Sequence, residues 1–97
     1  MPDMIVAYHF WSPTCGPCKV IKPAIEDLKE EFPQVSWMSV NTHDDEMHLA
    51  ARLDVTVVPT IVVVAEKDGV VVYKEKHSGT TMASYYRILR NAIRSSA

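Results

Sequence analysis

The sequence is poor in cysteine and glycine, with two and three of them among 97 residues, and neither charge sign is in strong excess. Two cysteines only three positions apart would close a very small loop, which argues against a fold that disulfide bonds stabilise. A formal net charge of −2, with no basic cluster interleaved with aromatic residues, argues against nucleic acid and anionic membranes as partners.

Long apolar segments are also missing. The run at 61–65 is far shorter than a membrane span, and the first residues lack the positive start and apolar stretch of a signal peptide. These features predict a protein without a membrane partner that works in the cytoplasm. With 47% hydrophobic and 23% charged residues, the composition is globular, and residues 1–97 are expected to form a single domain.

Hydrophobic periodicity predicts strands at 4–10, 35–40, 60–65 and 70–76, and helices at 16–32, 46–53 and 81–94. Asp44 is expected to cap the second helix, Thr80 or Thr81 the third, and Asp68-Gly69 to form a hairpin turn. The order β-α-β-α-β-β-α predicts an α/β fold with a mixed four-stranded sheet and helices on both faces.

The first two helices are amphipathic. Apolar residues at helical spacing are expected to face the core, and they include Val20 and Met47. Charged residues such as Glu26 and Lys29 are expected on a solvated face. Pro23 is expected to kink the first helix.

The motif Cys15-Gly16-Pro17-Cys18 stands where the first predicted strand passes into the first predicted helix. Free N–H groups and the positive end of the helix dipole stabilise a thiolate at such a position. Cys15 is therefore expected there with its sulfur facing solvent, and Cys18 one turn further on and more buried. Gly16 and Pro17 suit a first helical turn, where the missing N–H of proline costs nothing.

This placement predicts dithiol–disulfide exchange without a metal or cofactor. The Cys15 thiolate attacks a substrate disulfide, and Cys18 then attacks Cys15 to release the reduced substrate. Two other roles stay open. The pair could be half of a zinc or iron–sulfur site, although no histidine shows paired ligand spacing with it, or it could consist of two inert core cysteines.

The stretch at 10–19, Phe-Trp-Ser-Pro-Thr-Cys-Gly-Pro-Cys-Lys, resembles the active-site segment of the thioredoxin family. Pro23 matches the family's helix proline, and Gly79 matches the glycine before its last helix. Val58-Pro59-Thr60 matches the segment in which the family carries a cis-proline. The resemblance therefore implies a thioredoxin-like fold with a cis Val58–Pro59 bond.

The resemblance also implies roles for residues around the two catalytic cysteines. The residues implied to support the cysteine pair are Gly16, Pro17, Pro59, His9 and Trp11. The residues implied to bind substrate are Trp11, Thr14, Val58, Pro59 and Gly79.

Several positions depart from the family pattern. Cys15 comes so early that the family's first strand and helix are expected to be absent, which makes the strand at 35–40 a sheet edge. Thr14 replaces the usual tryptophan, so a flat apolar contact surface is expected to be lost. Trp11 is expected either to take over part of that contact surface or to pack in the core. His9 stands where the family keeps a buried aspartate, and Ser39 where many members have a lysine. His9 is expected either to exchange a proton with Cys18 or to be a packed neutral imidazole.

The function that follows from the motif and the resemblance is a protein-disulfide reductase, an electron carrier of the thioredoxin type. Its expected partners are disulfide-containing proteins and a separate reductase, by resemblance thioredoxin reductase, and the protein is expected to be a monomer. Two alternatives stay open: a thioredoxin-like docking module or subunit with little redox turnover, and a glutaredoxin-like enzyme recharged by glutathione.

Overall fold

The structure of the chain is a computed structural model, and it describes residues 4–97. The elements follow one another in the predicted order. They are β1 (Met4–Trp11), α1 (Gly16–Glu31), β2 (Ser36–Asn41), α2 (Leu49–Arg52), β3 (Thr60–Lys67), β4 (Val70–Ser78) and α3 (Met82–Ser96). This order and its mixed sheet confirm the predicted α/β class.

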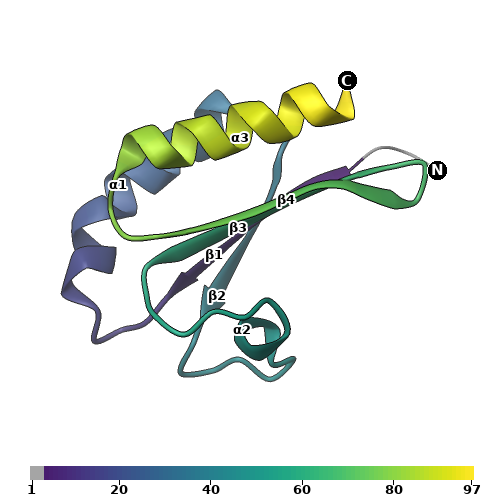
Figure 1. The fold of residues 1–97 in the computed structure, drawn as a ribbon. Coiled ribbons are helices and arrows are strands. Elements are labelled where there is room, and N and C mark those ends of the chain that lie inside the picture. The colour runs from purple at the N-terminus through teal and green to yellow at the C-terminus, as the bar shows by residue number, and fades with distance from the viewer. Residues whose placement is uncertain (1–3) are drawn as a thin grey trace.

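The four strands form one sheet in the order β2-β1-β3-β4. β1 pairs with β2 in parallel, while β1 with β3 and β3 with β4 are antiparallel. Helices α1 and α3 lie on one face of the sheet and α2 on the other (Figure 1). Within residues 4–97 no strand pairs with the outer side of β2, which confirms that the strand predicted at 35–40 is a sheet edge.

Alternating side chains of β1 and β3 supply two cores, one on each face of the sheet. The larger core packs against α1 and α3 and contains, among others, Ile5, Ala7, Ile61, Leu28 and Leu89. The smaller core, under α2, is built from Phe10, Val40 and Val62, with half-buried side chains of α2 packed on it. The face of β1 that carries Ile5 and Ala7 therefore also directs His9 toward α1.

The turn between β3 and β4 confirms the predicted hairpin. Asp68 and Gly69 have φ angles of 54° and 80°. A two-residue turn of type I′ needs positive φ at both central residues, which aspartate tolerates and glycine adopts without strain.

The second helix is shorter than predicted, and its cap was misplaced. The helix begins only at Leu49, because His48 adopts a left-handed conformation with φ 54°. The carboxylate of Asp45, not that of Asp44, accepts hydrogen bonds from the N–H groups of Leu49 and Ala50, both at 2.9 Å. These two bonds hold the pKa of Asp45 below its ordinary value.

Two apolar side chains predicted to face the core are exposed. Met47 precedes the helix instead of lying in it, and it is 62% exposed. Val20 lies on α1 but is 78% exposed, because the buried stripe of the helix runs through Cys18, Ile21, Ile25 and Leu28. Val20 is about 100° around the helix from Ile21 and so faces solvent.

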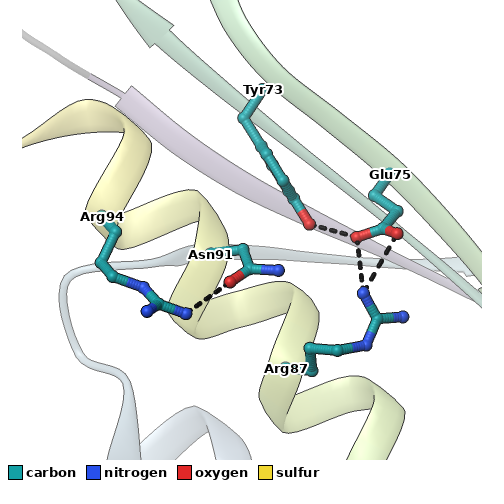
Figure 2. Close-up of polar contacts among 5 residues, drawn as sticks. All are labelled: Tyr73, Glu75, Arg87, Asn91 and Arg94. Carbon is teal, nitrogen blue, oxygen red and sulfur yellow. Dashed lines mark hydrogen bonds and ion pairs between the residues drawn. The ribbon is translucent and has the colours of Figure 1, made fainter.

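Polar side chains join the far edge of the sheet to the helix above it (Figure 2). The Tyr73 hydroxyl of β4 donates a hydrogen bond to the carboxylate of Glu75. Arg87 of α3 donates from Nη1 to both oxygens of that carboxylate at 3.2 Å, and further along the same helix Arg94 donates to Asn91 at 2.6 Å. Because Arg87 is exposed and Glu75 is only half-buried, their pair contributes about 1 kcal/mol at most and mainly orients α3 on β4.

Candidate active site

Strand register brings three loops to one end of the sheet. Phe10 lies opposite Thr60, and Thr60 lies opposite Ser78. The residues that follow Phe10, precede Thr60 and follow Ser78 therefore lie at the same end of the strands. Gly79 N–H donates to the carbonyl oxygen of Pro59 at 2.9 Å. The bond between Val58 and Pro59 is cis, as the resemblance implied. The cysteine loop, Pro59 and Gly79 therefore lie at the same end of the molecule.

Cys15 and Cys18 form a disulfide with a Cα–Cα distance of 5.3 Å. Cys15 is the N-cap of α1, and the backbone N–H of Cys18 donates to Cys15 Sγ at 3.1 Å. Exposed Gly16 and Pro17 fill the first turn. A thiolate at Cys15 would thus meet an N–H donor and the positive end of a 16-residue helix, as the motif predicts.

One expectation about the cysteines was wrong. Cys15 was expected to face solvent but is only 8% exposed, while Cys18, expected to be more buried, is 6% exposed. The chain makes a tight turn before the helix, in which the Cys15 N–H donates to the Ser12 carbonyl oxygen at 3.2 Å. In the disulfide form, the difference between the two residues is therefore their place on α1 and not their burial.

A cavity of about 280 Å³ lies beside the disulfide and reaches Cys18. His9, 7% exposed, lines this cavity together with Cys18, as strand alternation predicts. Within residues 4–97, His9 Nε2 has no hydrogen-bond partner. Burial, and then the positive charge of Lys29, lowers the pKa of His9 from 6.5 to about 4. The imidazole is therefore neutral around neutral pH.

Trp11 lies at the cavity and belongs to neither of the two core clusters found in residues 4–97. Its side chain is half-buried and lines the cavity, and its indole N–H donates to Ser39 Oγ at 2.8 Å. Thr14 is exposed, with its hydroxyl 3.4 Å from that of Ser12. Ser39 of β2 thus accepts the hydrogen bond of the indole N–H and lines the cavity beside Trp11.

Charged side chains at the cavity were missed from the sequence. Lys22, Glu26 and Lys29 line it, and Lys29, expected on a solvated face, has only 34% of its side chain exposed and bonds Glu26 at 3.2 Å. A signal was present, because Lys22 and Lys29 follow Cys18 by four and eleven positions and so share one stripe of α1.

Tyr85 of α3 connects the loop at Gly79 to the core through a hydrogen bond. The Tyr85 side chain is completely buried, and its hydroxyl donates to the Gly79 carbonyl oxygen at 2.8 Å. Its ring packs edge-on between His9 and His77, with ring centroids 6.3 and 5.7 Å away. Burial raises the pKa of Tyr85 to about 12.

We expect Tyr85→Phe to lower the free energy of unfolding by about 1 kcal/mol, because the half-buried Gly79 carbonyl loses its donor while the ring contacts remain. Urea denaturation measures this change. Tyr8→Phe is the matched control, since no hydrogen bond of the Tyr8 hydroxyl is found within residues 4–97. An equal, negligible loss in both variants would contradict a stabilising role for the Tyr85 hydroxyl.

Two further classes of site were searched for in the part of the chain that the structure describes. Residues 4–97 contain no cluster of three or more histidine, cysteine or acidic side chains that could hold a metal ion. No helix in the same residues is both long and apolar enough to cross a bilayer.

The fold and the site define a small α/β protein whose first helix begins at a cysteine pair within disulfide distance. A family model described as Thioredoxin matches residues 2–87. The chain belongs to the thioredoxin family.

Individual relatives agree with this assignment. The thioredoxin of Mycoplasma genitalium is 40% identical over 58 residues, which are 60% of this chain and 56% of that protein. The chain thus spans little more than half the length of this curated relative. The structure of Fasciola hepatica thioredoxin superposes with a TM-score of 0.77 at 30% identity, covering 92% of this chain and 81% of that one.

A complex is also among the similar structures. A chain in a crystal structure of ferredoxin: thioredoxin reductase with thioredoxin f2 superposes with a TM-score of 0.77 at 28% identity. The similarity covers 93% of this chain and 78% of that chain.

Proposed function

We propose that the protein is a thiol–disulfide oxidoreductase that reduces disulfide bonds of protein substrates through Cys15 and Cys18. The observation that carries the proposal is the disulfide at the start of α1, in which Cys15 is the N-cap and its sulfur accepts the Cys18 N–H at 3.1 Å. The same donor and the helix dipole would stabilise Cys15 as a thiolate, the form that attacks disulfides.

The reaction has two exchange steps. The Cys15 thiolate attacks one sulfur of the substrate disulfide, that bond breaks, and the other substrate sulfur leaves as a thiolate that takes up a proton. Cys18 then loses its proton and attacks Cys15, so that the mixed disulfide breaks and the second substrate sulfur leaves. The substrate disulfide is reduced to two thiols, and the two cysteines are oxidised to the disulfide seen here.

Substrate would bind at the end of the sheet where the three loops meet. Thr14 is exposed beside Cys15, and Pro59 and Gly79 are joined by a backbone hydrogen bond. We place the substrate chain along Val58 and Pro59, where main-chain pairing gives affinity with little sequence preference. Trp11 would form one wall of this surface.

The dithiol must be recharged after each turnover by a separate reductase. A solved complex pairs a similar thioredoxin f2 with ferredoxin: thioredoxin reductase, which supports a protein reductase as the partner of this chain. Thioredoxin reductase as the particular enzyme, the cytoplasm as the location and the monomeric state stay predictions from the sequence.

Reduction of insulin tests the proposed function. The dithiol protein, recharged by dithiothreitol, is expected to accelerate insulin precipitation well above dithiothreitol alone. The variant with both Cys15→Ser and Cys18→Ser is the control for the background reaction. If wild-type protein and this double variant behave alike while both are folded, the oxidoreductase proposal fails and the docking-module alternative is favoured.

We propose that His9 accepts the proton that Cys18 loses in the second step. His9 and Cys18 line one cavity, and His9 Nε2 has no partner among the described residues. In the disulfide state the pKa of about 4 keeps the imidazole neutral and its lone pair free. A thiolate that forms nearby attracts positive charge and so raises that pKa during the transfer.

His9→Ala is therefore expected to slow the second step by up to about 100-fold, the lower range of general acid–base catalysis. Rapid-quench kinetics of mixed-disulfide decay measures this step. His9→Asp should restore part of the rate, because a carboxylate also accepts a proton, and the first step should keep its rate in all three proteins. Equal decay rates would assign His9 to packing alone.

A further inference from the structure

The cavity beside Cys18 has the composition of a ligand site. Apolar atoms, including those of the Trp11 indole and of Ile25, make up most of its wall, while Lys19, Lys22 and Lys29 line it from α1. Glu26 is the single acidic residue of the lining, and it is bonded to Lys29. The lining therefore carries three positive charges against one negative charge, although the whole chain has a formal net charge of −2.

A buried histidine ring also borders the cavity. His9 also lines the cavity, is 7% exposed and has an Nε2 atom without a hydrogen-bond partner within residues 4–97. The Nε2 atom is itself covered by protein atoms, so a ligand in the cavity would lie against the imidazole ring and not against this nitrogen. The ring therefore adds a wall without positive charge, in contrast to the cations of α1.

We infer that this cavity binds a small organic anion, a carboxylate carried on a compact apolar body. The apolar walls and Trp11 would hold the body, and the carboxylate would face the lysines of α1. A volume of about 280 Å³ lies just below the range of about 300–1,000 Å³ of drug-sized sites, so a ligand smaller than a drug molecule, such as benzoate, fits.

Binding of benzoate to the disulfide form tests the inference, with the indole N–H resonance of Trp11 and the ring resonances of His9 as readouts. Saturable, one-to-one shifts of both residues are expected. Benzamide matches benzoate in size but has no charge, and acetate has the charge without the apolar body. Both are expected to bind at least about tenfold more weakly.

Charge variants of α1 show whether the anion lies where we place it. Lys29→Gln is expected to weaken benzoate binding at least threefold, whereas Glu26→Gln should strengthen it, because it removes the one negative charge of the lining. Lys74→Gln, an exposed change on β4, is the matched control and should bind as the wild type does.

Three results would overturn the inference: no saturation up to the solubility limit of benzoate, equal binding of benzamide, or unchanged binding in both α1 variants. The measurement uses the disulfide form and no redox turnover. Its failure can therefore be told apart from failure of the insulin assay, which tests the cysteines alone.

Discussion

A Cys18→Ser variant mixed with a disulfide-bonded protein is expected to accumulate a covalent complex in which Cys15 is joined to the substrate. Cys15 forms the mixed disulfide in the first step, and only the Cys18 sulfur can break it from within the protein. Cys15→Ser should form no such complex. Cys18 lies one turn inside α1, and its backbone N–H donates to the Cys15 sulfur, so the hydrogen bond favours a thiolate at Cys15 and not at Cys18. Non-reducing electrophoresis and peptide mapping distinguish the two variants.

Both single variants should reduce insulin at the rate of dithiothreitol alone, since turnover needs both sulfurs. The expected loss is complete on the scale of the assay, which makes it the largest effect predicted for any substitution in this chain. Cys15 and Cys18 are almost equally buried in the disulfide form, so the expected difference in trapping is argued from their places on α1. A complex trapped through Cys18 in the Cys15→Ser variant would reverse the assignment of attacking and resolving cysteine.

The sequence predicted the fold well because most of its local signals agree with one another. Apolar alternation along β1 correctly directs Ala7 and His9 to the same face, and the Asp68-Gly69 pair correctly marks the hairpin. That Pro59, Gly79 and the cysteine loop lie close together was implied by the resemblance alone. It depends on the register of three strands, which no local pattern specifies.

Errors arose where one residue type could play two roles. Asp44 and Asp45 have the same capping side chain, and only the left-handed turn at His48 makes Asp45 the one that reaches Leu49. Lys29 follows charged residues on a surface-like stretch of α1. Whether such a side chain points into water or lines a cavity depends on the strand beneath the helix.

His9 shows what the sequence could not decide. Its place on β1 predicted that it faces the cysteines, but the choice between a charged and a neutral imidazole depends on burial and on neighbouring charge. The structure shows a side chain that is almost fully buried with a lysine nearby, and both disfavour the imidazolium. His9 is therefore neutral in the disulfide form at neutral pH.

The low pKa of His9 makes the free energy of unfolding depend on pH. In the unfolded chain a histidine takes up a proton near pH 6.5, whereas in the folded protein the pKa of His9 is about 4. Between these values the unfolded state binds more protons, so the free energy of unfolding falls as the pH falls. The contribution is fully present above pH 6.5 and is lost as the pH drops toward about 4.

We expect this loss to reach about 3 kcal/mol at pH 4 and about 2 kcal/mol at pH 5, from ~1.4 kcal/mol for each pH unit between the two pKa values. His9→Asn removes the titrating group, so its free energy of unfolding should fall less on acidification by these amounts. Urea denaturation of both proteins from about pH 4 to pH 8 measures the difference, and the titration of acidic residues, which is common to both proteins, cancels. His43→Asn, an exposed site, is the control and should follow the wild type. Parallel curves for wild type and His9→Asn would mean that His9 takes up its proton in the folded protein as readily as in the unfolded chain.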